Sequence, residues 1–84
     1  MEFKKIIELF LELNEAKKSQ ELEWTSTGNT RYETNWNGQE IIIDRRNNVN
    51  KDSQEIYLKI DEFEKEYLPE SEEFKSLAKI LDTI

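Results

Sequence analysis

The sequence predicts an α+β fold: an N-terminal helix, a four-stranded antiparallel meander and a C-terminal helix, with both helices on one face of the sheet. Three observations lead to this prediction. Apolar residues recur at helical spacing near both ends of the chain. The central part alternates apolar and polar residues, as half-buried strands do. Asn37-Gly38, a strong short-range signal for a β-hairpin, separates two of the alternating segments.

Residues 2–18 form the first predicted helix. The segment contains no glycine or proline, and its apolar side chains recur three and four positions apart: Phe3, Ile6, Ile7, Phe10, Leu13 and Ala16. Leu9 and Leu11 widen the apolar arc beyond what one contact surface needs. We therefore expect the helix to contact the sheet and one more element, either the second helix or a second subunit. A central core helix is the simpler interpretation.

The meander begins with a predicted strand at residues 22–25, followed by a turn at 26–29. Residues 31–36 and 39–44 form the hairpin around Asn37-Gly38, because a type I′ turn needs positive φ at both central residues. This turn fixes the register. One face then carries the pairs Trp36–Gln39, Thr34–Ile41 and Tyr32–Ile43, and the other face sets Arg31 opposite Asp44, with Glu33, Glu40 and Lys59 turned to solvent.

Beyond the hairpin we expect a polar loop at residues 45–53 and a fourth strand at 54–60. Residues 61–68 are ambiguous. Phe63 and Tyr67 are four apart, as on a helix, but apolar and polar residues also alternate there. Because Glu and Lys favour helix over strand, we expect a short helix. After Pro69 the last helix begins, with Ser71 as its N-cap.

Composition limits where the protein works. The 84 residues predict a single domain, 1–84, with 37% charged and 36% hydrophobic residues. The chain has no cysteine, and a secreted domain this small usually needs disulfides, so we expect a cytoplasmic location. No stretch approaches the roughly 20 apolar residues of a membrane span, so we expect no membrane partner.

Histidine is absent as well as cysteine, which removes the usual general base and the common nucleophile pairs and zinc ligands. We therefore expect no enzymatic activity and no cofactor. Asn48, Asn50 and Asp52 have the first spacings of a calcium loop, but Ser53 replaces its glycine and Lys59 replaces its bidentate carboxylate. We expect no metal site.

A direct nucleic-acid partner is also not expected, because phosphate binding needs clustered positive charge and the sequence pI is about 4.6. Arg45-Arg46 are the exception to consider. An acidic partner or a phosphate could use them, but pairing with nearby acids of the same chain is the simpler interpretation.

The negative charge is concentrated between residues 61 and 73, a segment that contains seven acidic residues and one basic residue, Lys65. That local charge of −6 compares with −7 for the whole chain. One interpretation is a solvated face that gives only solubility. The other is a surface that covers a basic site on another protein, with aromatic anchors inside a charged rim. The candidate residues are Asp61, Glu62, Phe63, Glu64, Glu66, Tyr67, Glu70, Glu72 and Glu73.

We expect a non-enzymatic, acidic protein-binding module of the inhibitor, immunity or anti-defence kind, whose partner has a basic surface. The alternative is a structural or assembly subunit that homodimerises through the N-terminal helix or a sheet edge. A small carboxylate enzyme is a third hypothesis and would need one acid that titrates above its usual range. The Lys-, Ile- and Asn-rich usage suggests an AT-rich genome, bacterial or phage.

Overall fold

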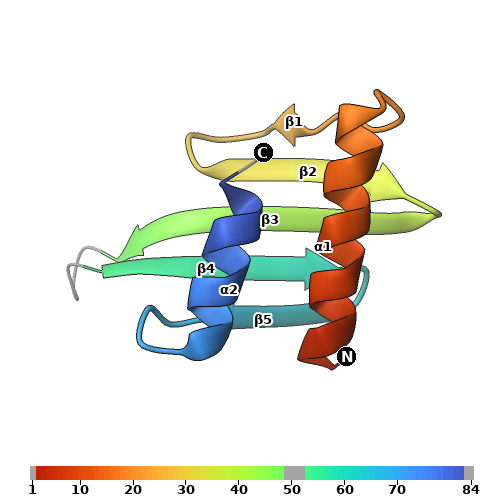
Figure 1. The fold of residues 1–84 in the computed structure, drawn as a ribbon. Helices are drawn as coiled ribbons and strands as arrows, with labels where there is room; N and C mark the ends of the chain where they lie inside the picture. The colour runs from red at the N-terminus through yellow and green to blue at the C-terminus, as the bar shows by residue number, and fades with distance from the viewer. Residues whose placement is uncertain (1, 49–52, 83–84) are drawn as a thin grey trace.

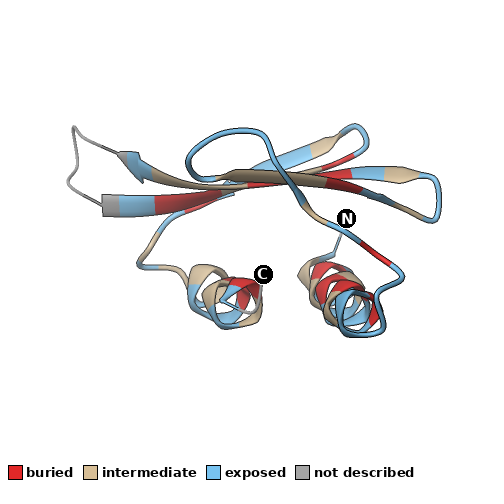
Figure 2. Ribbon diagram, turned by 90° about the horizontal axis from the view of Figure 1, so that it is seen from above, coloured by how far each residue is buried: buried red, intermediate tan, exposed pale blue. Residues whose placement is uncertain are grey.

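The computed structural model describes residues 2–48 and 53–82, and these residues form two layers. One layer is a five-stranded antiparallel sheet in the order β1-β2-β3-β4-β5. The other layer consists of two helices that lie across the strands on one face of the sheet (Figures 1 and 2). The elements are α1 (Phe3–Lys18), β1 (Thr25–Ser26), β2 (Arg31–Trp36), β3 (Gln39–Asn48), β4 (Ser53–Ile60), β5 (Phe63–Tyr67) and α2 (Glu72–Leu81). The predicted α+β class is confirmed, with five strands instead of four.

The β2–β3 hairpin has the predicted register. Asn37 and Gly38 have φ values of 52° and 78°, as a type I′ turn requires. Trp36 pairs with Gln39, and the ladder continues through every predicted pair to Arg31–Asp44. The Arg31–Asp44 pair does not form the expected ion pair. Arg31 Nε instead lies 3.4 Å from Glu33 Oε2.

The prediction of a short helix at residues 61–68 is wrong, because these residues form a hairpin with β4. Asp61 and Glu62 make a two-residue turn, with Asp61 at φ 52°, a conformation that Asp tolerates better than most residues. Asp61 also bonds to the start of β3: its N–H donates to Glu40 O, and its Oδ1 accepts from the Glu40 N–H, each at 2.9 Å. Sheet pairing therefore overrides the helical propensity of Glu and Lys.

Two other strand boundaries differ from the prediction. The expected loop at 45–53 is mostly strand: β3 runs to Asn48 and β4 starts at Ser53, while residues 49–52 lie outside the described part. The rejected calcium motif therefore falls largely outside it too. At the other edge, only Thr25 and Ser26 pair with β2. The preceding residues are held differently, since Thr34 Oγ1 donates to Glu23 O at 2.9 Å.

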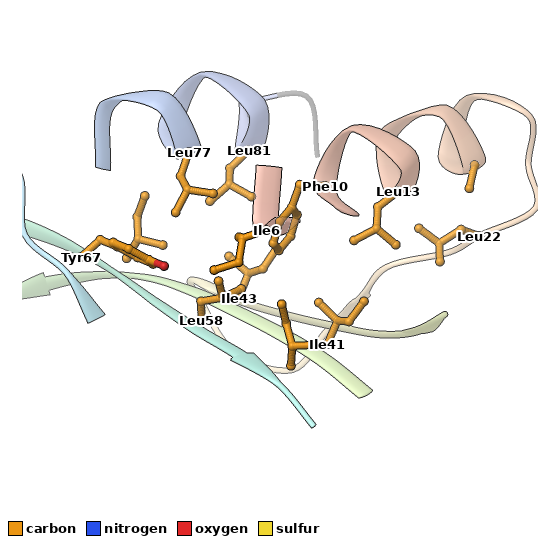
Figure 3. Close-up of a cluster of buried hydrophobic side chains, with 13 residues drawn as sticks. Ile6, Phe10, Leu13, Leu22, Ile41, Ile43, Leu58, Tyr67, Leu77 and Leu81 are labelled. Atoms are coloured by element: carbon orange, nitrogen blue, oxygen red, sulfur yellow. The ribbon is translucent and has the colours of Figure 1, made fainter. Parts of the chain in front are cut away.

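The core lies between the sheet and the helices (Figure 3). α1 contributes four buried side chains, Ile6, Phe10, Leu13 and Ala16, and α2 contributes Leu77 and Leu81. The sheet contributes Ile41, Ile43, Ile56, Leu58, Ile60 and Tyr67. α1 also touches α2, where Asn14 Nδ2 donates to Ile80 O at 3.3 Å. The broad apolar arc of α1 thus has its two contact surfaces within this chain.

The C-terminal helix starts where the sequence predicts. The Phe74 N–H donates to Ser71 Oγ at 3.1 Å, so that Ser71 is the N-cap. Glu72 and Glu73 occupy the first turn, where negative charge interacts favourably with the helix dipole.

The other sheet face has no helix over it (Figure 2). Most charged residues of the strands lie on this open face, whereas Arg45 and Lys65 lie on the helix side. Glu33, Ile42 and Lys59 form one cross-strand row there. Ile42 is only 3% exposed although it lies on this open face. Its cross-strand neighbours are Glu33 and Lys59, whose aliphatic stems can lie over an apolar side chain.

Candidate functional site

The nine candidate residues do not share one face; they surround β5, an edge strand of the sheet. Asp61 and Glu62 form the turn before it. Glu64 and Glu66 project from its open face, because they pair with Lys59 and Tyr57. Glu70 lies in the connection to α2, and Glu72 and Glu73 lie in the first turn of that helix. The structure therefore distributes the acidic segment over the turn, the open face and the helix layer.

On the open face, the side chains of Glu64 and Glu66 are held by neighbours from inner strands. The Tyr57 hydroxyl donates to Glu64 Oε1 at 2.5 Å. The Arg46 guanidinium lies 4.4 Å from the centroid of the Tyr57 ring, and its Nη1 donates to Glu66 Oε1 at 3.3 Å. Arg46 Nε is also 3.5 Å from Asp44 Oδ2. Both carboxylates thus have a defined direction along the edge.

These contacts change the acidity of the phenol. The hydrogen bond to Glu64, together with burial and the nearby negative charge of Glu64, raises the pKa of Tyr57 above its ordinary value of 10.0. Arg31 and Arg46 act in the opposite direction because they favour the phenolate. Tyr57 remains a neutral hydrogen-bond donor at physiological pH.

The helix-side residues of β5 do not form the exposed aromatic anchors that the sequence predicts. Tyr67 is 3% exposed and belongs to the core, where its ring meets Phe3 edge-on at 5.8 Å between centroids. Phe63 is half-buried against the same core. The reason is the strand parity of β5, which turns its odd-numbered residues toward the helices. Leu68, at 40% exposure, is the apolar side chain that remains accessible beside β5.

Lys65, the base of the acidic segment, also points to the helix side. Its Nζ lies 3.8 Å from Glu73 Oε2 and 5.3 Å from the centroid of the Tyr67 ring. Lys75 Nζ is 3.6 Å from Glu72 Oε1. The two acids of α2 are therefore paired within the chain. Glu62 and Glu70 are exposed, and no ion pair joins either to another described residue.

Sequence reasoning missed Arg46 and Tyr57 as parts of this site. Both lie on strands, and the predicted hairpin register, continued by two residues along β3, would have placed Arg46 on the same face as Asp44. The interpretation of Arg45-Arg46 as bases paired with nearby acids is confirmed. Arg45 Nη1 donates to Asp82 Oδ1 at 2.9 Å, which ties β3 to the end of α2.

A second candidate is an open groove of about 860 Å³ near the C-terminal end of α1. Its lining residues are Lys17, Gln20, Glu21, Leu22, Glu23, Trp24 and Tyr32. Trp24 Nε1 and Trp36 Nε1 are buried and have no hydrogen-bond partner within the described residues. Both tryptophans pack partly buried against the core.

Residues 2–48 and 53–82 contain neither a metal site nor a membrane-spanning helix. No group of three or more carboxylates there is arranged to hold a metal ion. No helix in that part of the chain is both long enough and apolar enough to cross a bilayer.

Comparison with known proteins gives no further guide to function. The chain matches no protein-family model, and neither the curated proteins nor the solved structures include a significant match to it.

Proposed function

We propose that this protein is a non-enzymatic protein-binding module whose acidic β5 edge covers a basic site on a partner protein. The β5 edge is defined here as Asp61, Glu62, Glu64, Glu66, Leu68 and Glu70. The observation that carries the proposal is that five of the seven acids of residues 61–73 lie on or beside an edge strand rather than on a helix face. An inhibitor, immunity or anti-defence protein would use such a surface.

The preorganised carboxylates support this proposal. Tyr57 and Arg46 hold Glu64 and Glu66 in place, so these two side chains lose less conformational entropy when a basic side chain of the partner binds them. Each carboxylate can accept further hydrogen bonds, because it offers about four lone-pair sites. Leu68 adds an exposed apolar group beside the charges. This combination resembles the arrangement of a small apolar contact inside a polar rim.

The surface would increase the rate of association more than the strength of the final complex. Complementary charge steers encounter and selects partners, and salt screens it over a Debye length of about 8 Å at physiological ionic strength. We therefore expect binding to weaken as salt is added. The absence of cysteine supports a cytoplasmic location, which stays a prediction.

Affinity capture from the native host lysate at low and high salt tests the proposal. The variant changes Glu62, Glu64 and Glu66 to Gln. The matched control changes Glu8, Glu12 and Glu15 to Gln, which removes the same charge from exposed positions of α1. The proposal expects a specific partner that the parent and the control retain and that the β5 variant or high salt releases. A partner lost equally from both variants would contradict it, because only net charge would then matter.

A further inference from the structure

We infer that the partner binds β5 as an added β-strand, with basic side chains at alternate positions. This inference rests on the proposed function, because it assigns the partner's chemistry at the same edge. β5 ends the strand order, and no other segment within residues 2–48 and 53–82 pairs with its outer side. An unpaired strand edge is a template for another extended chain.

The hairpin geometry identifies the backbone groups that such a strand would use. In a two-residue hairpin the residues that flank the turn, Ile60 and Phe63, form a hydrogen-bonded pair, and the antiparallel ladder then alternates. Phe63, Lys65 and Tyr67 accordingly direct their backbone groups to β4. Glu64 and Glu66 direct their N–H and C=O groups outward, so a docked strand can form four backbone hydrogen bonds.

The side chains determine the sequence pattern of the partner. Glu64 and Glu66 occupy the open face, so the adjacent residues of an added strand on that face should be Lys or Arg. On the helix side the neighbours are Phe63, Lys65 and Tyr67. Lys65 disfavours another base there, and the rings favour an apolar residue. The fitting segment therefore alternates basic and apolar residues.

The same charges disfavour a second copy of this chain as the occupant. Two β5 strands that pair antiparallel about a twofold axis normal to the sheet keep their faces aligned. In the registers of greatest overlap, Glu64 then lies opposite Glu64 or Glu66 of the other copy. Like charges directly opposite each other destabilise a strand pair, and charged edges are a common protection against self-association.

A short synthetic peptide tests the inference without knowledge of the partner. The probe is an acetylated and amidated peptide of alternating Lys and Val with three Lys; its control has the same composition with the Lys residues consecutive. Amide hydrogen exchange of the full chain is measured by NMR with each peptide at low salt. Strand addition predicts that the alternating peptide slows exchange of the Glu64 and Glu66 amides about tenfold or more, while those of Phe63, Lys65 and Tyr67 change little.

A pair of variants separates backbone pairing from charge. Glu66→Pro removes an outward N–H at a position where an edge strand tolerates proline, and Glu66→Gln removes the same charge but keeps the N–H. Circular dichroism checks that each variant folds. We expect Glu66→Pro to bind the alternating peptide about tenfold more weakly than Glu66→Gln does.

The outcomes distinguish the inference from the proposed function. Suppose that both peptides bind equally, that Glu66→Gln weakens the binding of both, and that no amide is protected. Strand addition is then overturned, and the acidic surface stands. If neither peptide binds at low salt, strand addition is overturned and the acidic surface loses its support as well.

Discussion

Tyr57 reaches diagonally across the β4–β5 ladder to Glu64. Its Cα partner is Glu66, but its hydroxyl donates to Glu64 Oε1 at 2.5 Å. The tyrosine leans along the strand, and the Arg46 guanidinium lies over its ring and contacts Glu66. Tyr57 thus holds Glu64 directly, and the Arg46 guanidinium that lies over its ring holds Glu66.

Glu64→Gln should lower the pKa of Tyr57 toward its ordinary value. The amide still accepts a hydrogen bond, but it no longer places a negative charge beside the phenolate. The alkaline titration of tyrosinate absorbance measures this change, with Tyr57→Phe used to identify the Tyr57 component. A Tyr57 titration unchanged by Glu64→Gln would contradict the hydrogen bond described here.

The same contact predicts how stability depends on pH. The pKa of Tyr57 is raised on folding, so the folded state retains the proton longer than the unfolded state does. The stabilising contribution is complete below the unfolded value, about 10, and is lost as pH rises through the folded value. Denaturant unfolding across alkaline pH should therefore show a steeper loss of stability for the parent than for Tyr57→Phe.

Leu13→Ala should lower the free energy of unfolding by about 2–5 kcal/mol, because Leu13 lies on the buried side of α1 and is fully buried in the core. Leu11→Ala is the matched control on the same helix. Leu11 is 51% exposed, so its truncation should change stability by less than about 1 kcal/mol. Urea unfolding of both variants gives the comparison. Equal losses would mean that α1 does not pack in the orientation described.

Gly38→Ala should cost about 1–2 kcal/mol, although no atom lies within 4 Å of the added Cβ. The penalty arises from φ +78°, which an alanine adopts unfavourably. Gly28→Ala is the control, since its added Cβ would make only ordinary contact, 3.6 Å from Arg31 Cβ. Thermal unfolding should separate the two variants. Equal Tm values for them would argue against the Asn37-Gly38 turn.

The chain should be a monomer at high micromolar concentration. Leu11 and Leu68 are the exposed large hydrophobic side chains of the described residues, and single exposed leucines on separate elements do not make a dimer interface. Light scattering should give a mass near 10.1 kDa. Twice that mass would favour the assembly-subunit alternative, and would direct attention to α1 and the sheet edges.

Local signals predicted the parts of the fold that local chemistry determines. Asn37-Gly38 specifies its turn by backbone conformation alone, and Ser71 caps α2 through a hydrogen bond three residues away. The register of the β2–β3 hairpin follows from the turn, so its pairs could be deduced residue by residue. The helices could be placed because their apolar spacing is regular.

The remaining strands depend on contacts that are distant in sequence. Glu64, Lys65 and Glu66 have helical propensity, and only pairing with β4 makes them a strand. The turn at Asp61 contains no glycine from which it could be predicted, and it is held by hydrogen bonds to Glu40. Arg46 and Asn47 extend β3 with polar side chains, so no apolar alternation marks them. The acidic residues were found from sequence, but their place around an edge strand required the tertiary structure.

The most direct test of the β5 edge as the binding site is hydrogen exchange of the full chain in complex with the captured partner. Protection gained on binding should be concentrated in residues 61–68, at the β5 edge, and should be absent from the outer surface of α1. Protection confined to α1, or to the groove beside Trp24 and Tyr32, with β5 exchange unchanged, would contradict the assignment of this edge as the binding site.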